Sequence, residues 1–267
     1  MYIRKIRTVF SLVFILLLIQ SCNKKEQAKN MPPNVLFIAV DDMADWAGYL
    51  GHPDAITPNI DRLAQRGIAF TTTQCTAPIC GPSRAAVMTG MRPETTNVYS
   101  NVGNYSDYVP NAISIPEYFK QNDYYVMGAG KLIHPYNNVI PKAYHEFGPG
   151  VGIVGTPFTD EELSLEGFDP TKTIDRLQVT LPLNVISNMD RPKNRWSTFD
   201  WGPLDVLDDE MPDGQIANWG VKAIEKEFDK PFFIGVGFYK PHQPLFAPRK
   251  YFDMYDIDKI SLPPTTE

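Results

Sequence analysis

The segment C-G-P-S-R at residues 80–84 places a thiol and an arginine within one turn of a predicted helix. Pro82 suits the first turn of a helix, because the N–H that proline lacks has no partner there. The residues that follow are compatible with a helix that Gly90 would end. Cys80 would then lie at a helix N-terminus, where free N–H groups favour an anionic oxygen, and Arg84 would add a positive charge. The pattern indicates chemistry on an anionic group; the alternative is a buried cysteine ahead of an ordinary helix.

Two adjacent carboxylates follow a nearly continuous apolar run. Residues 34–40 predict a strand buried on both faces of a parallel sheet, and Asp41 and Asp42 come directly after it. Ligands gather at the carboxyl ends of strands in open α/β sheets, and paired carboxylates there need a cation to neutralise them. Ca²⁺ or Mg²⁺, which prefer oxygen ligands, fits this chemistry. The alternative is a polar turn with a helix cap.

Two basic clusters also follow predicted strands. Lys131 and His134 are three residues apart and could address one ligand from a turn, although a solvated lysine and a capping histidine are the alternative. Lys240 and His242 flank Pro241, which stiffens a turn that could equally be an ordinary surface turn. Histidine suits proton transfer because its pKa lies near working pH.

The remaining pattern predicts the elements that position these residues. We expect strands at residues 34–40, 68–73, 124–129 and 231–238, and helices at residues 57–67, 83–89, 113–122 and 215–228. Residues 136–210 are rich in Pro, Gly, Asp and Asn and predict surface loops or short hairpins. The alternation of strands and helices predicts an α/β fold with a doubly wound, mostly parallel sheet and helices on both faces.

The N-terminus predicts export. Three basic residues precede an apolar stretch at residues 9–19, which ends at Ser21 and Cys22. This pattern predicts a lipoprotein signal peptide at residues 1–21, a lipidated Cys22, and a polar tether at residues 22–32. The protein would be an exported, membrane-anchored lipoprotein on the periplasmic side or at the cell surface. A transmembrane anchor or an internal start at Met31 are the alternatives, but the apolar run is short for a membrane span.

The net charge limits the classes of partner that the protein could bind, and the cysteine content limits its disulfides. The formal net charge of −6 becomes −9 when residues 1–21, with three basic and no acidic residues, are removed. An acidic protein is a poor general binder of nucleic acid, so a polyanionic substrate must be held by a local basic pocket. With Cys22 lipidated, Cys75 and Cys80 remain, and no disulfide framework is expected. We expect Cys75 to be a free, buried thiol.

Taken together, these motifs resemble those of formylglycine-dependent sulfatases in the alkaline phosphatase superfamily. The resemblance extends over residues 33–267 and rests on motifs that occur in the family's order at residues 34–42, 57–64, 80–84, 130–135 and 240–242. The last two motifs, with Val206-Leu207-Asp208, are most similar to the iduronate-2-sulfatase branch. The resemblance implies a catalytic domain that removes sulfate from a sulfated glycan. The substrate that it indicates most strongly is a 2-O-sulfated uronate.

The same resemblance implies a nucleophile and a metal site. Cys80 would be oxidised to formylglycine by a separate maturation enzyme, and its hydrated aldehyde would attack sulfur. Asp41, Asp42 and residue 80 would ligate Ca²⁺, with Mg²⁺ as the other possibility. Arg84 would stabilise the hydrated aldehyde and its alkoxide.

Roles for the basic clusters also come from the family. Lys131 would bridge the sulfate and formylglycine, and His134 would accept a proton when the sulfated hemiacetal collapses. His242 would contact the sulfate and protonate the leaving alcohol. Lys240 would contribute to substrate binding.

The chain departs from the family pattern in its later part. Sulfatases add a later Asp-His or Asp-Asn pair to the metal site, a downstream lysine, and a C-terminal subdomain with a small antiparallel sheet. None of these is found by residue 267, so we expect a C-terminally truncated chain. Three ligands are few for Ca²⁺, which usually takes about six to eight oxygens. Alternatives are a non-catalytic sulfoglycan-binding lipoprotein and a phosphate or phosphonate ester hydrolase of the same superfamily.

Overall fold

The computed structural model describes residues 31–102, 105–134, 140–152, 155–159, 162, 173–181, 183–184 and 200–261. The chain divides into two units, residues 1–34 and residues 35–267. The predicted signal peptide and Cys22 lie outside the described residues. None of the helices in the described ranges is long and apolar enough to cross a bilayer.

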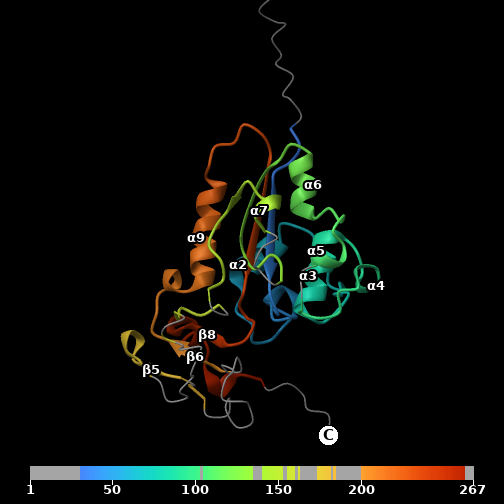
Figure 1. The fold of residues 1–267 in the computed structure, drawn as a ribbon. Coiled ribbons are helices and arrows are strands. Elements are labelled where there is room, and N and C mark those ends of the chain that lie inside the picture. Colours follow the sequence, from blue (N-terminus) through green and yellow to red (C-terminus); the bar gives the residue numbers. More distant parts are fainter. Residues whose placement is uncertain are drawn as a thin grey trace, which may run out of the picture. The chain divides into compact units, whose positions relative to one another are not determined.

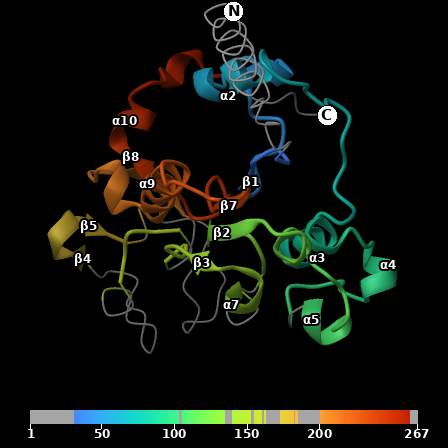
Figure 2. The same cartoon turned by 90° about the horizontal axis from the view of Figure 1, so that it is seen from above.

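A parallel sheet forms the centre of the second unit (Figure 1). Strand β7 (Phe232–Phe238) pairs with β1 (Val35–Val40) on one side and with β2 (Tyr125–Gly130) on the other, and β2 also pairs with β3 (Glu146–Phe147). The order β1-β7-β2-β3 can be followed from above in Figure 2. Because the three long strands are parallel and in register, their carboxyl ends meet at one edge of the sheet.

Helices cover both faces of this sheet. Helix α9 (Pro212–Ile224) packs on β7 and β2 through Ile216, and α3 (Cys80–Thr89) and α6 (Ile115–Gln121) lie on the opposite side (Figure 1). The α9 side contains the core residues Met127, Ala129, Ile234 and Val236. The opposite core includes Ala85 and Met88 of α3, with Phe119 of α6 packed against it. The predicted doubly wound α/β fold is confirmed.

Strand β1 differs from the prediction in its burial. Phe37 and Ala39 pack against the core on the α3 side, but Leu36 and Ile38 on the other face are 44% and 49% exposed. The register pairs Leu36 with Ile234 and Ile38 with Val236, whose side chains belong to the core under α9. Helix α9 packs on β7 and β2, and no helix in the described ranges covers the outer side of β1. The prediction of burial on both faces was therefore wrong for this edge strand.

The expected strand at residues 68–73 does not form. Helix α2 (Pro58–Ala64) ends before it, and Ile68 and Phe70 are among the most exposed apolar side chains. An isolated extended segment has no ladder hydrogen bonds to hold it, and no described strand pairs with this one. The prediction of a strand at residues 68–73, which rested on apolar and β-branched composition alone, was therefore wrong.

Shorter elements complete the unit. Strands β6 (Trp201–Leu204) and β8 (Leu245–Pro248) pair in parallel, and β4 (Thr173–Ile174) and β5 (Val179–Thr180) form a small antiparallel pair. A third core, which includes Phe158, Leu204, Met211 and Phe246, lies beneath them. The remaining helices are α4 (Pro93–Thr96), α5 (Tyr105–Tyr108), α7 (Ile140–Ala143) and α10 (Arg249–Phe252), and the 3₁₀ turns are η1 (Gly48–Leu50), η2 (Asp175–Leu177), η4 (Asp208–Glu210) and η5 (Ile257–Lys259).

Candidate active site

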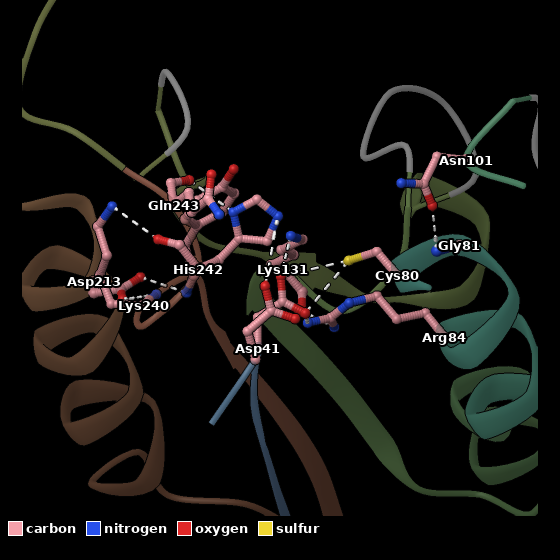
Figure 3. Close-up of polar contacts among 12 residues, drawn as sticks. Asp41, Cys80, Gly81, Arg84, Asn101, Lys131, Asp213, Lys240, His242 and Gln243 are labelled. Atoms are coloured by element: carbon pink, nitrogen blue, oxygen red, sulfur yellow. Dashed lines mark hydrogen bonds and ion pairs between the residues drawn. The ribbon is translucent and has the colours of Figure 1, made fainter. Parts of the chain in front are cut away.

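The carboxyl ends of three strands bring the predicted residues together. Asp41 follows β1, Lys131 follows β2, and the turn that carries His242 follows β7. Cys80 is the first residue of α3, as the proline-started helix predicted. In Figure 3 the Cys80 sulfur points toward Asp41, and His242 approaches from the opposite side.

Asp41 is the centre of the charge network. Lys131 Nζ donates a hydrogen bond to Asp41 Oδ2, and Arg84 Nη2 lies 3.0 Å from Asp41 Oδ1. Burial alone would raise the pKa of Asp41, but the hydrogen bond from Lys131 and the charges of Arg84 and Lys131 outweigh it and hold the pKa below its usual value. Arg84 Nη1 also donates to the Lys131 carbonyl oxygen. A buried carboxylate is thus kept ionised by two cations.

The Lys131 side chain is buried to an unusual degree, with only 1% of the residue exposed. A close approach of β2 and β7 makes this possible: the Lys131 N–H donates to Gly237 O at 2.8 Å. Gly130 has a φ of 72°, and a Cβ there would overlap the Gly237 carbonyl oxygen. The Lys131 ammonium also lies 4.2 Å from the centre of the Tyr239 ring.

Cys80 is placed for chemistry but is a weak nucleophile as a thiol. Its Sγ lies 3.4 Å from both carboxylate oxygens of Asp41. Burial raises the pKa of Cys80, and the Asp41 charge adds to this against the opposing effect of Lys131. A cavity of about 710 Å³ lies beside Cys80 and is also lined by Asp42 and Ser83. The surroundings therefore keep an unmodified Cys80 protonated as a thiol.

The first turn of α3 is held from outside the helix. The Gly81 N–H donates to Asn101 Oδ1 at 2.7 Å, and a Cβ on Gly81 would lie 2.8 Å from Ser100 O. This loop therefore fixes the orientation of Cys80 (Figure 3). Cys75 is a free thiol as predicted, but it is exposed and not buried, because the segment around it forms no strand and packs under no helix.

His242 lies beside Asp42. His242 Nε2 is 3.8 Å from Asp42 Oδ2, and Nδ1 is 2.7 Å from the Gln243 carbonyl oxygen. A carbonyl oxygen only accepts, so Nδ1 carries the hydrogen in this contact, and the neutral ring leaves Nε2 as an acceptor. Asp42 reaches this position from a left-handed backbone conformation with a φ of 53°, which aspartate tolerates better than most residues.

His134 lies in the field of the same charges. Burial lowers the pKa of His134, and the positive charges of Lys131 and Arg84 lower it further, while Asp41 acts in the opposite direction. The imidazole is therefore neutral at neutral pH. A neutral imidazole is the form that can accept a proton.

The Lys240 ammonium is bonded within the turn after β7. Its Nζ donates to the Pro244 carbonyl oxygen and lies 3.4 Å from His242 O, and its side chain lines a second cavity of about 400 Å³ with Asp208 and Asp213. Burial lowers the pKa of Lys240 to about 7, against the opposing charge of Asp213. Its role in substrate binding stays a prediction.

Two residues that the sequence analysis did not select belong to the site. Asp213, in the first turn of α9, accepts hydrogen bonds from the Tyr239 and Lys240 N–H groups, each at 2.8 Å. Tyr239 is buried between Lys131 and His242. An aspartate after Pro212 reads as an ordinary helix start, so its sequence signal was ambiguous.

The donor set fits a hard divalent cation. One ligand atom each from Asp41, Asp42 and His242 lies within 4.8 Å of the others. Carboxylate oxygens are the ligands that Ca²⁺ and Mg²⁺ prefer, and conversion of the Cys80 thiol to an oxygen-bearing group would add another of the same kind. Lys131 and Arg84 already neutralise Asp41, whereas Asp42 is exposed and available for an ion.

Comparison with known proteins places this site in a family. The sulfatase family model matches residues 33–263. A sulfatase of Formosa agariphila is 37% identical over 251 residues, which cover 90% of this chain and 45% of that protein. Human iduronate 2-sulfatase is 31% identical over 236 residues, which cover 88% of this chain and 40% of the relative. The chain thus spans less than half the length of these two relatives.

Solved structures agree with the fold. Ps i-CgsB, determined in complex with k-i-k-neocarrahexaose, has a TM-score of 0.53 and 26% identity, and the match covers 85% of this chain and 49% of that one. The phosphonate monoester hydrolase of Silicibacter pomeroyi has a TM-score of 0.58 at 19% identity, over 87% and 46% of the two chains, which is a likeness of fold alone. From the family match and the α/β architecture, the chain belongs to the sulfatase family.

Proposed function

We propose that the protein hydrolyses sulfate esters of a carbohydrate, with formylglycine made from Cys80 as the nucleophile. The observation that carries the proposal is the position of Cys80, at the first residue of α3 and 3.4 Å from an Asp41 carboxylate held ionised by Lys131 and Arg84. Sulfatases are the family to which the chain belongs. The protonated thiol is a weak nucleophile, which supports a modified residue at this position.

The aldehyde of formylglycine, once hydrated, supplies an oxygen nucleophile for sulfur. The side chains around it bind and neutralise a sulfate group: Arg84 and Lys131 provide fixed positive charge in a buried setting, where electrostatic interactions are stronger than in water. His134, neutral at working pH, accepts a proton at its ring. His242, with Nδ1–H on a carbonyl oxygen, holds a proton at Nε2 when charged and can pass it to the leaving alcohol.

Asp41, Asp42 and residue 80 would hold the divalent cation, Ca²⁺ or Mg²⁺. The cation would supply Lewis-acid polarisation of a sulfate oxygen.

The substrate that we propose is a sulfated glycan with a 2-O-sulfated uronate. Two features support this proposal: the 31% identity to human iduronate 2-sulfatase, and a cluster of buried cations in a chain of net charge −6. A polyanion held by such a protein must present one sulfate to this local site.

We further propose that Cys22 carries a lipid anchor that fixes the exported protein to a membrane. Metabolic labelling with a radioactive fatty acid tests this proposal, and the label should be lost in Cys22→Ala.

The test of the activity is hydrolysis after coexpression with a formylglycine-generating enzyme. We expect sulfate release from a disaccharide with a 2-O-sulfated uronate, its loss in Cys80→Ala, and its retention in the matched variant Cys75→Ala. Equal activity of Cys80→Ala and the unaltered protein would contradict the proposal. Release of phosphate from a phosphate ester, without sulfate release, would favour the phosphohydrolase alternative, and glycan binding without turnover would favour a binding protein.

A further inference from the structure

Asp213 has no role in the proposed chemistry, yet it holds two parts of the site together. Its two carboxylate oxygens accept hydrogen bonds from successive backbone N–H groups, Tyr239 to Oδ1 and Lys240 to Oδ2, each at 2.8 Å. Asp213 lies at the second position of α9, yet these bonds reach the turn after β7. The carboxylate therefore ties the start of a helix to the end of the central strand (Figure 3).

The backbone that Asp213 holds carries the Tyr239 ring into the centre of the site. Tyr239 is 2% exposed, and its ring centre lies 4.2 Å from Lys131 Nζ and 4.6 Å from the centre of the His242 ring. The Tyr239 carbonyl oxygen also accepts the His242 N–H at 3.0 Å. The positions of Lys131 and His242 thus both depend on one residue, and that residue is fixed through Asp213.

A neighbouring glycine leaves the ring little freedom. Gly155 has a φ of 68°, and a Cβ there would lie 2.5 Å from Tyr239 Cδ1. The ring is therefore packed against backbone on one side and against the Lys131 ammonium at 4.2 Å. A shift of the Tyr239 backbone would move the ring, and with it the packing of Lys131 and His242.

We propose that Asp213 is a positioning residue, which acts through Tyr239 to set Lys131 and His242 against Cys80. The proposal rests on the sulfatase function proposed for this site. Asp213 touches neither the proposed nucleophile nor the proposed metal ligands in the contacts that the structure gives it. Its effect on turnover is transmitted by two backbone hydrogen bonds and one aromatic ring.

The first test needs no activity. Asp213→Asn keeps the shape of the side chain, but its NH₂ group cannot accept one of the two backbone hydrogen bonds. The chain has four histidines, so their ring signals can be resolved by NMR and His242 assigned with His242→Gln. We expect Asp213→Asn to shift the His242 signals and leave those of His52 and His145 in place. The matched control Asp209→Asn, at an exposed carboxylate of η4, should shift none of them.

The second test measures turnover of the matured protein. Loss of one of the two backbone hydrogen bonds to Asp213 should lower kcat about ten- to a hundred-fold in Asp213→Asn. Because part of the effect passes through His242, the loss in the double variant with His242→Gln should be smaller than the product of the two single losses. A merely structural role would instead multiply the two losses.

The outcomes separate this inference from the proposed function. Unchanged His242 signals in folded Asp213→Asn, or multiplied losses in the double variant, would overturn the positioning role. No turnover by the matured, unaltered protein would contradict the proposed function, while the NMR measurement would still decide the positioning of His242. If Asp213→Asn does not fold, Asp213→Glu keeps both carboxylate oxygens but moves them by one methylene; it should shift the same His242 signals, and no shift would overturn the proposal.

Discussion

The buried pair of Lys131 and Asp41 allows a quantitative prediction for Lys131→Met. Methionine replaces all but the last atom of the unbranched side chain, and it removes the ammonium that bonds Asp41 and lies over Tyr239. Breaking one partner of a buried ion pair costs about 3–5 kcal/mol of unfolding free energy. Because Arg84 remains 3.0 Å from Asp41, we expect a loss near the lower end, about 3 kcal/mol at pH 7.

The sign of the pH dependence follows from the lowered pKa of Asp41. A depressed folded pKa contributes stability that is present above the unfolded value of about 3.9 and lost as pH falls through the folded value. The difference between the unaltered protein and Lys131→Met should therefore be largest near neutral pH. It should shrink below pH 4 or so, where Asp41 is protonated in the unfolded chain.

Urea unfolding of both proteins in EDTA, at pH 7 and at acid pH, measures this difference. The matched control is Lys226→Met, which breaks an exposed pair with Glu146 at 2.7 Å and should cost no more than about 0.5 kcal/mol. Equal, small losses for the two variants would refute the reasoning that Lys131 neutralises a buried carboxylate.

Three further predictions follow from the same site. Because burial, Lys131 and Arg84 lower the pKa of His134, its neutral form should persist below pH 6.5. In a pH–rate profile, kcat should therefore fall only below pH 6.5 on the acid side. A fall in kcat that begins above pH 7 would contradict this. Gly130→Ala and Gly90→Ala both place alanine at positive φ, but only the former meets a carbonyl oxygen, so thermal unfolding should show a loss of more than about 3 kcal/mol against about 1 kcal/mol. Chelation should abolish turnover that Ca²⁺ or Mg²⁺ restores, and Asp42→Asn should raise the metal concentration required; turnover that survives EDTA would refute the metal site.

Much of the site could be predicted from sequence because it lies at the ends of strands. The apolar runs before Asp41, Lys131 and Lys240 marked strands that the structure contains, and parallel strands in register bring their following residues to one edge. The proline of the segment at residues 80–84 likewise placed Cys80 at a helix start. These features are local, and their periodicity is visible in the chain.

What could not be predicted depends on long-range neighbours. Burial of β1 depends on which strands α9 covers, and the segment at residues 68–73 needed a partner strand that its own composition does not supply. The importance of Asp213 arises from hydrogen bonds to two amides far along the chain. Such contacts have no signature in a single sequence.

The most direct test of the central claim is peptide mass spectrometry of the protein produced with a formylglycine-generating enzyme, focused on the Cys80 peptide. We expect a loss of about 18 Da at residue 80, restored on hydration of the aldehyde, together with an unmodified Cys75. The sulfatase activity should rise in proportion to the fraction of Cys80 that is converted to formylglycine. A peptide that contains only thiol at residue 80, in a protein that still releases sulfate, would show that formylglycine is not the nucleophile.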